Sequence, residues 1–158
     1  MQKISPCIWF DNNAEEAVNF YLSIFKDSKI IRFTRNPPGS PGPEGELLVA
    51  YIQLEGQEII LLNGGFGHPL TDAISLTVNC NSQEEVDHYW NKLLESGGEE
   101  IACGWLKDRF GLFWQVTPTM LPQLISDPDS AKAGRVMQAM MKMIKLDIAT
   151  LKAAADAK

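Results

Sequence analysis

The side chains that most often perform catalysis or bind metals are scarce in this chain of 158 residues. Only two histidines are present, and His88 falls on the expected polar face of a helix, where a solvated side chain is typical. His68 falls in a glycine-rich linker, which favours a plain loop residue, although it could also cover a pocket. Cys7 could be a nucleophile if a base lowered its thiol pKa. No histidine or lysine adjoins it, so we expect an unreactive cavity thiol.

Two pairs of adjacent glutamates, Glu15-Glu16 and Glu84-Glu85, could suggest acid–base catalysis. Both pairs fall in the first turn of an expected helix, where carboxylates favour the positive end of the helix dipole. Asn13 and Ser82 each stand three residues before the second glutamate of a pair, which is the spacing of a capping box. We therefore expect the glutamates to cap helices.

These residues belong to a segment that occurs twice. Ile4-Ser5 and Ile74-Ser75 each open an apolar strand, 70 positions apart, and the following helices, Asn13–Tyr21 and Ser82–Trp90, are 69 positions apart. A duplicated strand–helix unit predicts two similar modules, and duplicated sheets usually enclose a shared cavity. Any function is expected where the two copies face each other.

Hydrophobic periodicity predicts the order β-α-β-β-β twice, which is an α+β fold, followed by a C-terminal helix. The Pro- and Gly-rich segment 36–45 predicts a long loop. After Pro118 we expect a short helix, Met120–Ile125, and one long helix from Ser130 to about Ala155. The expected strands are Ile4–Phe10, Lys29–Arg35, Leu47–Leu54, Glu58–Asn63, Ala73–Cys80, Ile101–Leu106 and Leu112–Thr117, and a further strand before Cys103 is poorly marked in the sequence.

The predicted organisation is one structural domain with four parts. A first module spans residues 1–63, a linker 64–72, a second module 73–118 and a helical extension 119–158. The long helix carries Met137, Met141, Ile144, Ile148 and Leu151 at heptad-like spacing. This stripe is expected to pack on the sheet or on a second subunit, and a Met-rich stripe could also be a binding surface.

Alternation along the strands predicts which side chains line the cavity. Apolar sets such as Ile4, Ile8 and Phe10 should lie under the helices, whereas the opposite faces are small and polar in both copies, as in a cavity wall. Ile60 stands four residues after Gly56, and Gln115 stands four residues after Gly111. We therefore expect Ile60 and Gln115 to occupy equivalent positions in the two modules. The ligand-binding candidates are Ser5, Cys7, Trp9, Ile60, Leu62, Ser75, Thr77, Phe113, Gln115 and Thr117.

Composition limits the classes of partner. The net charge of −6 and the lack of a Lys/Arg cluster argue against nucleic acid. No apolar run approaches the ~20 residues of a membrane span, and no signal peptide is expected. Three cysteines, two of them in hydrophobic strands, are typical of buried thiols in a reducing compartment. We expect a soluble cytoplasmic protein.

The repeated unit, with its Asn-x-Ala-Glu-Glu-Ala-x-x-Phe-Tyr helix, resembles the vicinal-oxygen-chelate superfamily of glyoxalase, bleomycin- and fosfomycin-resistance proteins and extradiol (dihydroxybiphenyl) dioxygenases. The stretch from Phe10 through Phe25 is similar to its PhnB-like family. Cys103–Val116 and the tail Arg135–Ile148 resemble the subgroup labelled demethylubiquinone methyltransferase-like. This resemblance covers nearly the whole chain, and it implies two β-α-β-β-β modules and a homodimer.

The resemblance also implies where a metal would bind. The superfamily's ligand positions fall on Ser5, Ser75, Gln115 and Ile60, with Leu62 as an alternative to Ile60. None carries a histidine or a carboxylate, so we expect no metal and no cofactor. The methyltransferase label lacks support too, because Gly64-Gly65-Phe66-Gly67 leads to Pro69 and a strand, not to the helix of a common S-adenosylmethionine site.

The leading hypothesis is a metal-free protein that binds a small apolar or partly aromatic molecule in the cleft between the modules. Trp9, Phe113 and Trp105 would supply stacking area, and Ser5, Ser75, Thr77 and Gln115 polar anchors. An enzyme of unrecognised activity is the alternative, with Cys7, or with Lys107 and Arg109, in the same cleft. An assembly module built on the C-terminal helix is the third possibility.

Overall fold

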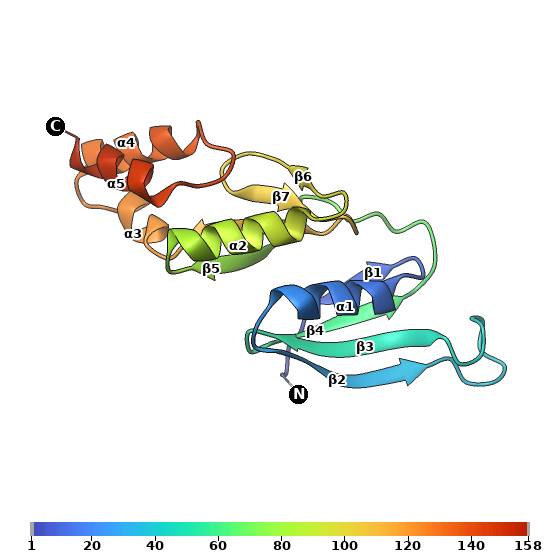
Figure 1. Cartoon of the computed structure of the whole chain (residues 1–158). Coiled ribbons are helices and arrows are strands. Elements are labelled where there is room, and N and C mark those ends of the chain that lie inside the picture. The colour runs from blue at the N-terminus through green and yellow to red at the C-terminus, as the bar shows by residue number, and fades with distance from the viewer. Residues whose placement is uncertain (1, 158) are drawn as a thin grey trace. The chain divides into compact units, whose positions relative to one another are not determined.

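The chain divides into two compact units, which the computed structural model describes over residues 2–157. Described residues up to Leu70 form the first unit, and those from Thr71 onward form the second. Each unit holds one four-stranded sheet with a helix against it (Figure 1). No helix within residues 2–157 has the length and apolar character needed to cross a membrane.

The first unit is a mixed sheet with one face covered by a helix. Its elements are β1 (Cys7–Phe10), α1 (Ala14–Ile24), β2 (Ser28–Arg35), β3 (Leu47–Leu54) and β4 (Gln57–Asn63). The strand order is β1-β4-β3-β2; β1 runs parallel to β4, and the other pairs are antiparallel. The apolar stripe of α1 packs on β3 and β4 (Figure 1), because burial of that stripe removes apolar surface from water. The buried residues include Ala17, Val18, Tyr21, Ile24, Ala50, Ile52 and Leu61.

The second unit repeats this plan with shorter outer strands. It contains β5 (Leu76–Cys80), α2 (Gln83–Leu94), β6 (Glu99–Glu100), β7 (Trp105–Lys107) and β8 (Phe113–Pro118), in the order β5-β8-β7-β6. The predicted β-α-β-β-β order is therefore confirmed in both units. The strand expected at Ile101–Leu106 is wrong in its first half, because Cys103 and Gly104 have φ values of 57° and 84°, which interrupt an extended strand.

The strand register is duplicated as well. Cys7 pairs with Ile60 between β1 and β4, and Thr77 pairs with Gln115 between β5 and β8. Since Cys7 and Thr77 are equivalent in the repeat, Ile60 and Gln115 are equivalent too. The predicted match of these two residues is confirmed.

The helix start of α2 has its predicted side-chain cap, whereas that of α1 does not. In α2, Ser82 Oγ accepts a hydrogen bond from the Glu85 amide at 3.3 Å, as predicted, and the Glu85 carboxylate accepts one from the Asn81 amide. In α1, the Asn13 side chain caps nothing. Asn63 Oδ1, at the end of β4, accepts from the Ala14 amide at 2.9 Å instead. A tertiary contact has replaced the local cap.

The C-terminal region is three helices, so the single long helix expected from Ser130 to about Ala155 is wrong. The elements are α3 (Leu121–Ile125), α4 (Ser130–Met140) and α5 (Ile148–Asp156). The helix breaks because the carbonyls of Met143 and Ile144 accept hydrogen bonds from the amides of Cys103 and Gly104, each at 2.8 Å. Leu146 is fully buried against Gly104, and Asp147 caps α5.

The predicted apolar stripe is divided by this break. Met137, Met141 and Ile144 are exposed, whereas Leu151 is fully buried. The buried cluster of this region consists of Leu121, Val136, Leu146, Leu151 and Ala155.

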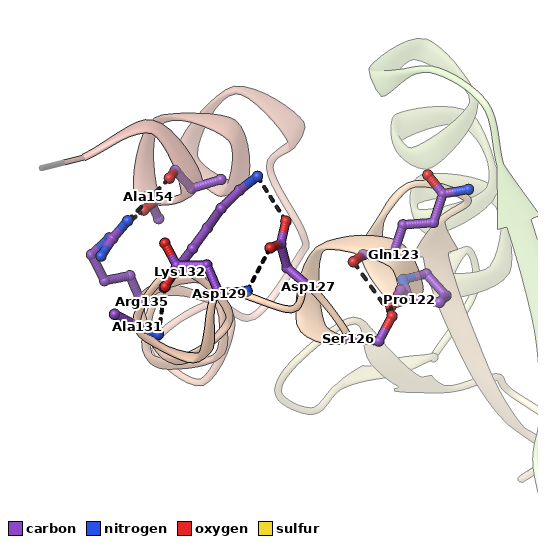
Figure 2. A network of polar contacts seen from close by, with 10 residues as sticks. Pro122, Gln123, Ser126, Asp127, Asp129, Ala131, Lys132, Arg135 and Ala154 are labelled. Carbon is purple, nitrogen blue, oxygen red and sulfur yellow. Dashed lines mark hydrogen bonds and ion pairs between the residues drawn. The ribbon is translucent and has the colours of Figure 1, made fainter.

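Polar contacts tie the C-terminal helices to one another (Figure 2). Asp129 caps α4 by accepting from the Ala131 and Lys132 amides, and Lys132 forms an ion pair with Asp127 at 2.8 Å. Arg135 donates to the carbonyls of Ala154 and Ala155, which belong to the last turn of α5 and lack helical partners. The extension therefore has its own core and its own polar framework.

Candidate functional site

The face of the first sheet that points away from α1 carries a continuous row of side chains. Arg32, Tyr51, Ile60 and Cys7 are successive partners across β2, β3, β4 and β1. Neighbours in the strands, such as Ile52 and Leu61, are fully buried on the α1 side. Because side chains alternate between faces, the row lies on the open face.

A hollow of about 660 Å³ lies over this row. Ser5 and Ile60, two of the predicted ligand-binding residues, line it. The other predicted residues of the first unit, Cys7, Trp9 and Leu62, are not among its lining residues. Two of the five candidates in this unit therefore border the hollow, and the other three do not.

The Trp9 side chain does not border the hollow, because it contacts the segment that follows β4. Its indole N–H donates to the Gly65 carbonyl at 2.7 Å, and its ring centroid lies 4.3 Å from that of His68. Gly64 is tight against the same ring. Trp9 and His68 thus anchor the residues after β4 to the first unit.

Cys7 belongs to the row, and within residues 2–157 no ion pair or hydrogen bond activates its thiol. Its side chain is exposed, yet desolvation by the surrounding protein raises the pKa of its thiol above the ordinary value. A raised pKa leaves less thiolate at neutral pH. This direction is opposite to that of a catalytic cysteine.

Several residues that border the hollow were not predicted from the sequence. They are Gln2, Lys3 and Ile4 from the segment before β1, Ile31 and Arg32 from β2, Tyr51 from β3, and Glu58 and Ile59 from β4. Ile4 was expected under a helix, but β1 begins only at Cys7, and Ile4 is 86% exposed. The alternation of β3, which places Tyr51 opposite Ile60, was the signal that could have found Tyr51.

Strand alternation alone could not have found both Ile31 and Arg32. Ile30 pairs with Ile52 and Arg32 pairs with Tyr51, so three consecutive residues of β2 face two of β3. This β-bulge lets two adjacent side chains reach the same hollow.

The equivalent face of the second unit is more polar. Gln115 Nε2 donates to Ser75 Oγ at 2.9 Å, and Gln115 pairs in register with Thr77 and Trp105. Trp105 therefore occupies the position that Tyr51 has in the first unit. Thr117 pairs with Asn79, and Phe113 pairs with Lys107.

The hairpin-turn residues considered for catalysis have structural contacts. Lys107 Nζ forms an ion pair with Glu99 at 2.9 Å, and the Arg109 guanidinium carbon lies 4.8 Å from the Phe110 ring centroid. Asp108, which is 1% exposed, accepts from the amides of Phe110 and Leu112 and from the Trp114 indole. Asp108 thus holds the turn between β7 and β8.

No group of three or more His, Cys, Asp or Glu side chains within residues 2–157 is arranged to hold a metal ion. At the positions where the resemblance places the metal ligands, the second unit has an amide hydrogen-bonded to a hydroxyl, and the first has Ser5 and an alkyl group, Ile60. Such neutral donors do not fit a tightly bound divalent cation.

Comparison with solved structures identifies related folds. The PhnB protein from Bacillus cereus, which carries a 3-demethylubiquinone-9 3-methyltransferase description, is 36% identical; the match covers 74% of this chain and 99% of that one, with a TM-score of 0.67. Protein PA1353 from Pseudomonas aeruginosa is 20% identical over 75% of this chain and 98% of that one, with a TM-score of 0.62.

A third match shares the fold at low identity. It is a mutant of the fosfomycin resistance protein FosX from Listeria monocytogenes, complexed with Mn(II) and 1S,2S-dihydroxypropylphosphonic acid. That protein is 14% identical over 73% of this chain and 91% of its own, with a TM-score of 0.53. No curated protein matches the chain.

The family comparison covers both sheets. Residues 2–117 match the family described as 3-demethylubiquinone-9 3-methyltransferase, so the match ends before α3, α4 and α5. Together with the 36% identity to the PhnB protein, this match shows that the chain belongs to the PhnB-like 3-demethylubiquinone-9 3-methyltransferase family and has the vicinal-oxygen-chelate fold.

Proposed function

We propose that this protein binds a small organic molecule without a metal ion, in the hollow on the open face of the first sheet. The observation that carries the proposal is the hollow itself, about 660 Å³ in volume and bordered by Ser5, Tyr51 and Ile60. Small-molecule sites are usually concave, of roughly 300–1,000 Å³, and mostly apolar with a few polar groups. The volume of the hollow falls in this range, and its border combines isoleucines with polar side chains.

The donor set supports binding without a metal. Gln115 and Ser75 satisfy each other through a 2.9 Å hydrogen bond, and neither is ionised. Ile60 offers no donor atom. A divalent ion at these positions would lose water ligands and gain no charged ones.

The state of Cys7 supports binding over covalent catalysis. A raised thiol pKa lowers the thiolate concentration available for attack at neutral pH. The common S-adenosylmethionine architecture also requires a helix directly after its glycine-rich turn. Here β4 is followed by Gly64-Gly65 and then by β5, without an intervening helix. Reversible binding therefore accounts for the site better than methyl transfer does.

The first experiment is a metabolite screen by thermal shift, with a matched pair of variants. Ile60→Gln introduces a polar amide into the hollow, and Val49→Gln introduces the same group on the same sheet face outside it. A ligand of the hollow should bind Ile60→Gln about 10-fold more weakly, because a buried aliphatic contact contributes roughly 1–3 kcal/mol. It should bind Val49→Gln as it binds the unmodified chain. Equal loss in both variants would contradict this location.

Calorimetric titration with Zn²⁺ and Ni²⁺ tests the metal-free part. We expect no binding tighter than millimolar, because no histidine or carboxylate occupies the equivalent positions. Micromolar binding that Ser75→Ala or Gln115→Ala abolishes would overturn it.

We also propose that the protein is a homodimer. The strands β1 and β2 end the first sheet, and β5 and β6 end the second, so each sheet has edges that can pair with another chain. Sedimentation equilibrium at micromolar concentration should give twice the chain mass of 17.6 kDa. A constant 17.6 kDa across the concentration range would reject the dimer.

A further inference from the structure

We propose that the ligand of the hollow is a hydrophobic carboxylate, whose anionic head pairs with Arg32 and whose apolar body lies across Tyr51 and Ile60. This inference rests on the proposed function and adds the chemical class of the ligand. Four observations carry it: an arginine without an ion pair, a local excess of positive charge, exposed isoleucines and the spacing of the strands.

The two arginines of β2 differ in their contacts. Arg35 forms an ion pair with Glu15 at 3.0 Å and donates to the Gly45 carbonyl. Arg32 forms no ion pair with any carboxylate of residues 2–157, and its guanidinium carbon lies 4.3 Å from the Tyr51 ring centroid. A guanidinium stacked on an aromatic ring keeps its N–H donors at its edges. Arg32 is thus oriented at the hollow with its donors available for a planar anion.

The charge around the hollow is positive, although the protein is acidic. Lys3 and Arg32 border it with one carboxylate, that of Glu58. Glu58 already accepts a hydrogen bond of 2.7 Å from the Gln2 amide. The two cations and this carboxylate together give the border of the hollow one net positive charge. In a chain with a net charge of −6, a positive hollow selects an anionic ligand.

Four isoleucines form the apolar part of the border, and two of them are exposed. Ile4 is 86% exposed and Ile31 is 46% exposed, and Ile60 forms the central part of the border beside Tyr51. Clustered exposed isoleucines mark a surface that a partner covers. A free inorganic anion would leave them in water, whereas an apolar body would bury them.

The spacing of the strands sets an upper limit on the distance that this ligand spans, because the Arg32 guanidinium lies over the Tyr51 ring of β3. Arg32 on β2 and Ile60 on β4 are separated by β3, which carries Tyr51. Two strand spacings amount to about 10 Å. A bicyclic aromatic acid has about this length from carboxylate to distal ring edge, so one molecule can reach both residues.

The test compares 2-naphthoate with its neutral analogue 2-naphthamide at low ionic strength. We expect 2-naphthoate to bind about 10-fold more tightly, the order that one charge-assisted hydrogen-bonded pair supplies. Arg32→Gln should remove this preference. Arg35→Gln, on the same strand and already paired with Glu15, should retain it. Isoleucine methyl resonances of Ile31 and Ile60 should shift on binding, and those of Ile148 in α5 should not.

The outcomes separate this inference from the proposed function. If both probes bind equally, shift Ile60 and are weakened by Ile60→Gln alone, the hollow binds ligands but the carboxylate preference is wrong. If Arg32→Gln and Arg35→Gln weaken 2-naphthoate equally, the preference is a diffuse charge effect and the role of Arg32 is overturned. If neither probe shifts Ile31 or Ile60 at millimolar concentration, the ligand class is wrong; the metabolite screen then decides the proposed function by itself.

Discussion

Single residues determine which groups of the first unit remain available to a ligand. Trp9 was a natural candidate for stacking, since it is the only aromatic side chain of β1 besides buried Phe10. Its indole is instead bonded to Gly65 and lies against His68. The aromatic side chain at the hollow is Tyr51, whose ring is stacked with Arg32.

Gly64→Ala should destabilise the first unit. A Cβ at this position would lie 2.1 Å from Trp9 Cζ2, so the indole must move and lose its hydrogen bond to Gly65. Gly64 does not have a positive φ, so the effect is steric rather than conformational. We expect a loss of about 1–3 kcal/mol in the free energy of unfolding, measured by urea denaturation.

Gly134→Ala is the matched control for this change. Gly134 lies inside α4, and a Cβ there would meet no atom within 4 Å. Since alanine is the better helix former, this substitution should stabilise by about 0.5–1 kcal/mol. A Gly64→Ala variant as stable as the parent would show that the Trp9 contact is not tight in solution.

At the scale of elements, backbone hydrogen bonds to the C-terminal extension explain why periodicity failed there. The residues from Met137 to Leu151 have helical spacing in the sequence, but Met143 and Ile144 use their carbonyls to bind Cys103 and Gly104. Gly104 has no Cβ, and this absence leaves the space that the Leu146 side chain occupies. The two segments can therefore approach each other closely. No local pattern encodes a contact between residues about 40 positions apart.

Asp87 and Lys145 form an ion pair between α2 and the segment before α5. Lys145 Nζ lies 2.6 Å from Asp87 Oδ1, and Gln83 donates to the same oxygen. The hydrogen bond from Lys145, then that from Gln83, holds the pKa of Asp87 below its ordinary value of 3.8. A carboxyl whose pKa is lowered by folding stabilises the folded state above its unfolded pKa.

Docking of the extension should therefore weaken as the pH falls below 3.8 towards the lowered pKa of Asp87. Hydrogen-exchange protection of the Cys103 and Gly104 amides reports on it, because their acceptors lie in the segment before α5. In Asp87→Asn, protection should be lower at neutral pH and should change less between pH 5 and 3. If the parent and the variant lose protection in parallel, Asp87 is not the titrating group.

At the scale of the whole molecule, the repeat in the sequence predicted most of the fold. Equivalent strands and helices recur in both units, and Ile60 and Gln115 occupy equivalent positions. These features follow from hydrophobic alternation, which is a local property of each strand. Among the residues that border the hollow, Ser5 and Ile60 were candidates from the sequence, whereas Arg32 depends on a β-bulge and Ile4 on where β1 begins. The β-bulge and the start of β1 both depend on pairing with other strands.

The helical extension lies beyond the part of the chain that matches the family. The family match ends at residue 117, and α3 to α5 follow with their own buried cluster around Leu146 and Leu151. Met137, Met141 and Ile144 remain exposed on this extension.

The unequal outer strands suggest how the two halves of the molecule diverged after duplication. The strand β2 has eight residues and a bulge, whereas its counterpart β6 has two. Since β2 has no buried residue and β3 has four, we expect insertions and deletions to destabilise the fold less in β2 than in β3. Deleting Ile31 would remove the irregularity between Ile30 and Arg32 and change the lining of the hollow, while the irregularity between Thr34 and Arg35 would remain. A new ligand preference can therefore evolve in this fold by a change in strand length, and related chains with equal cores can differ in what they bind.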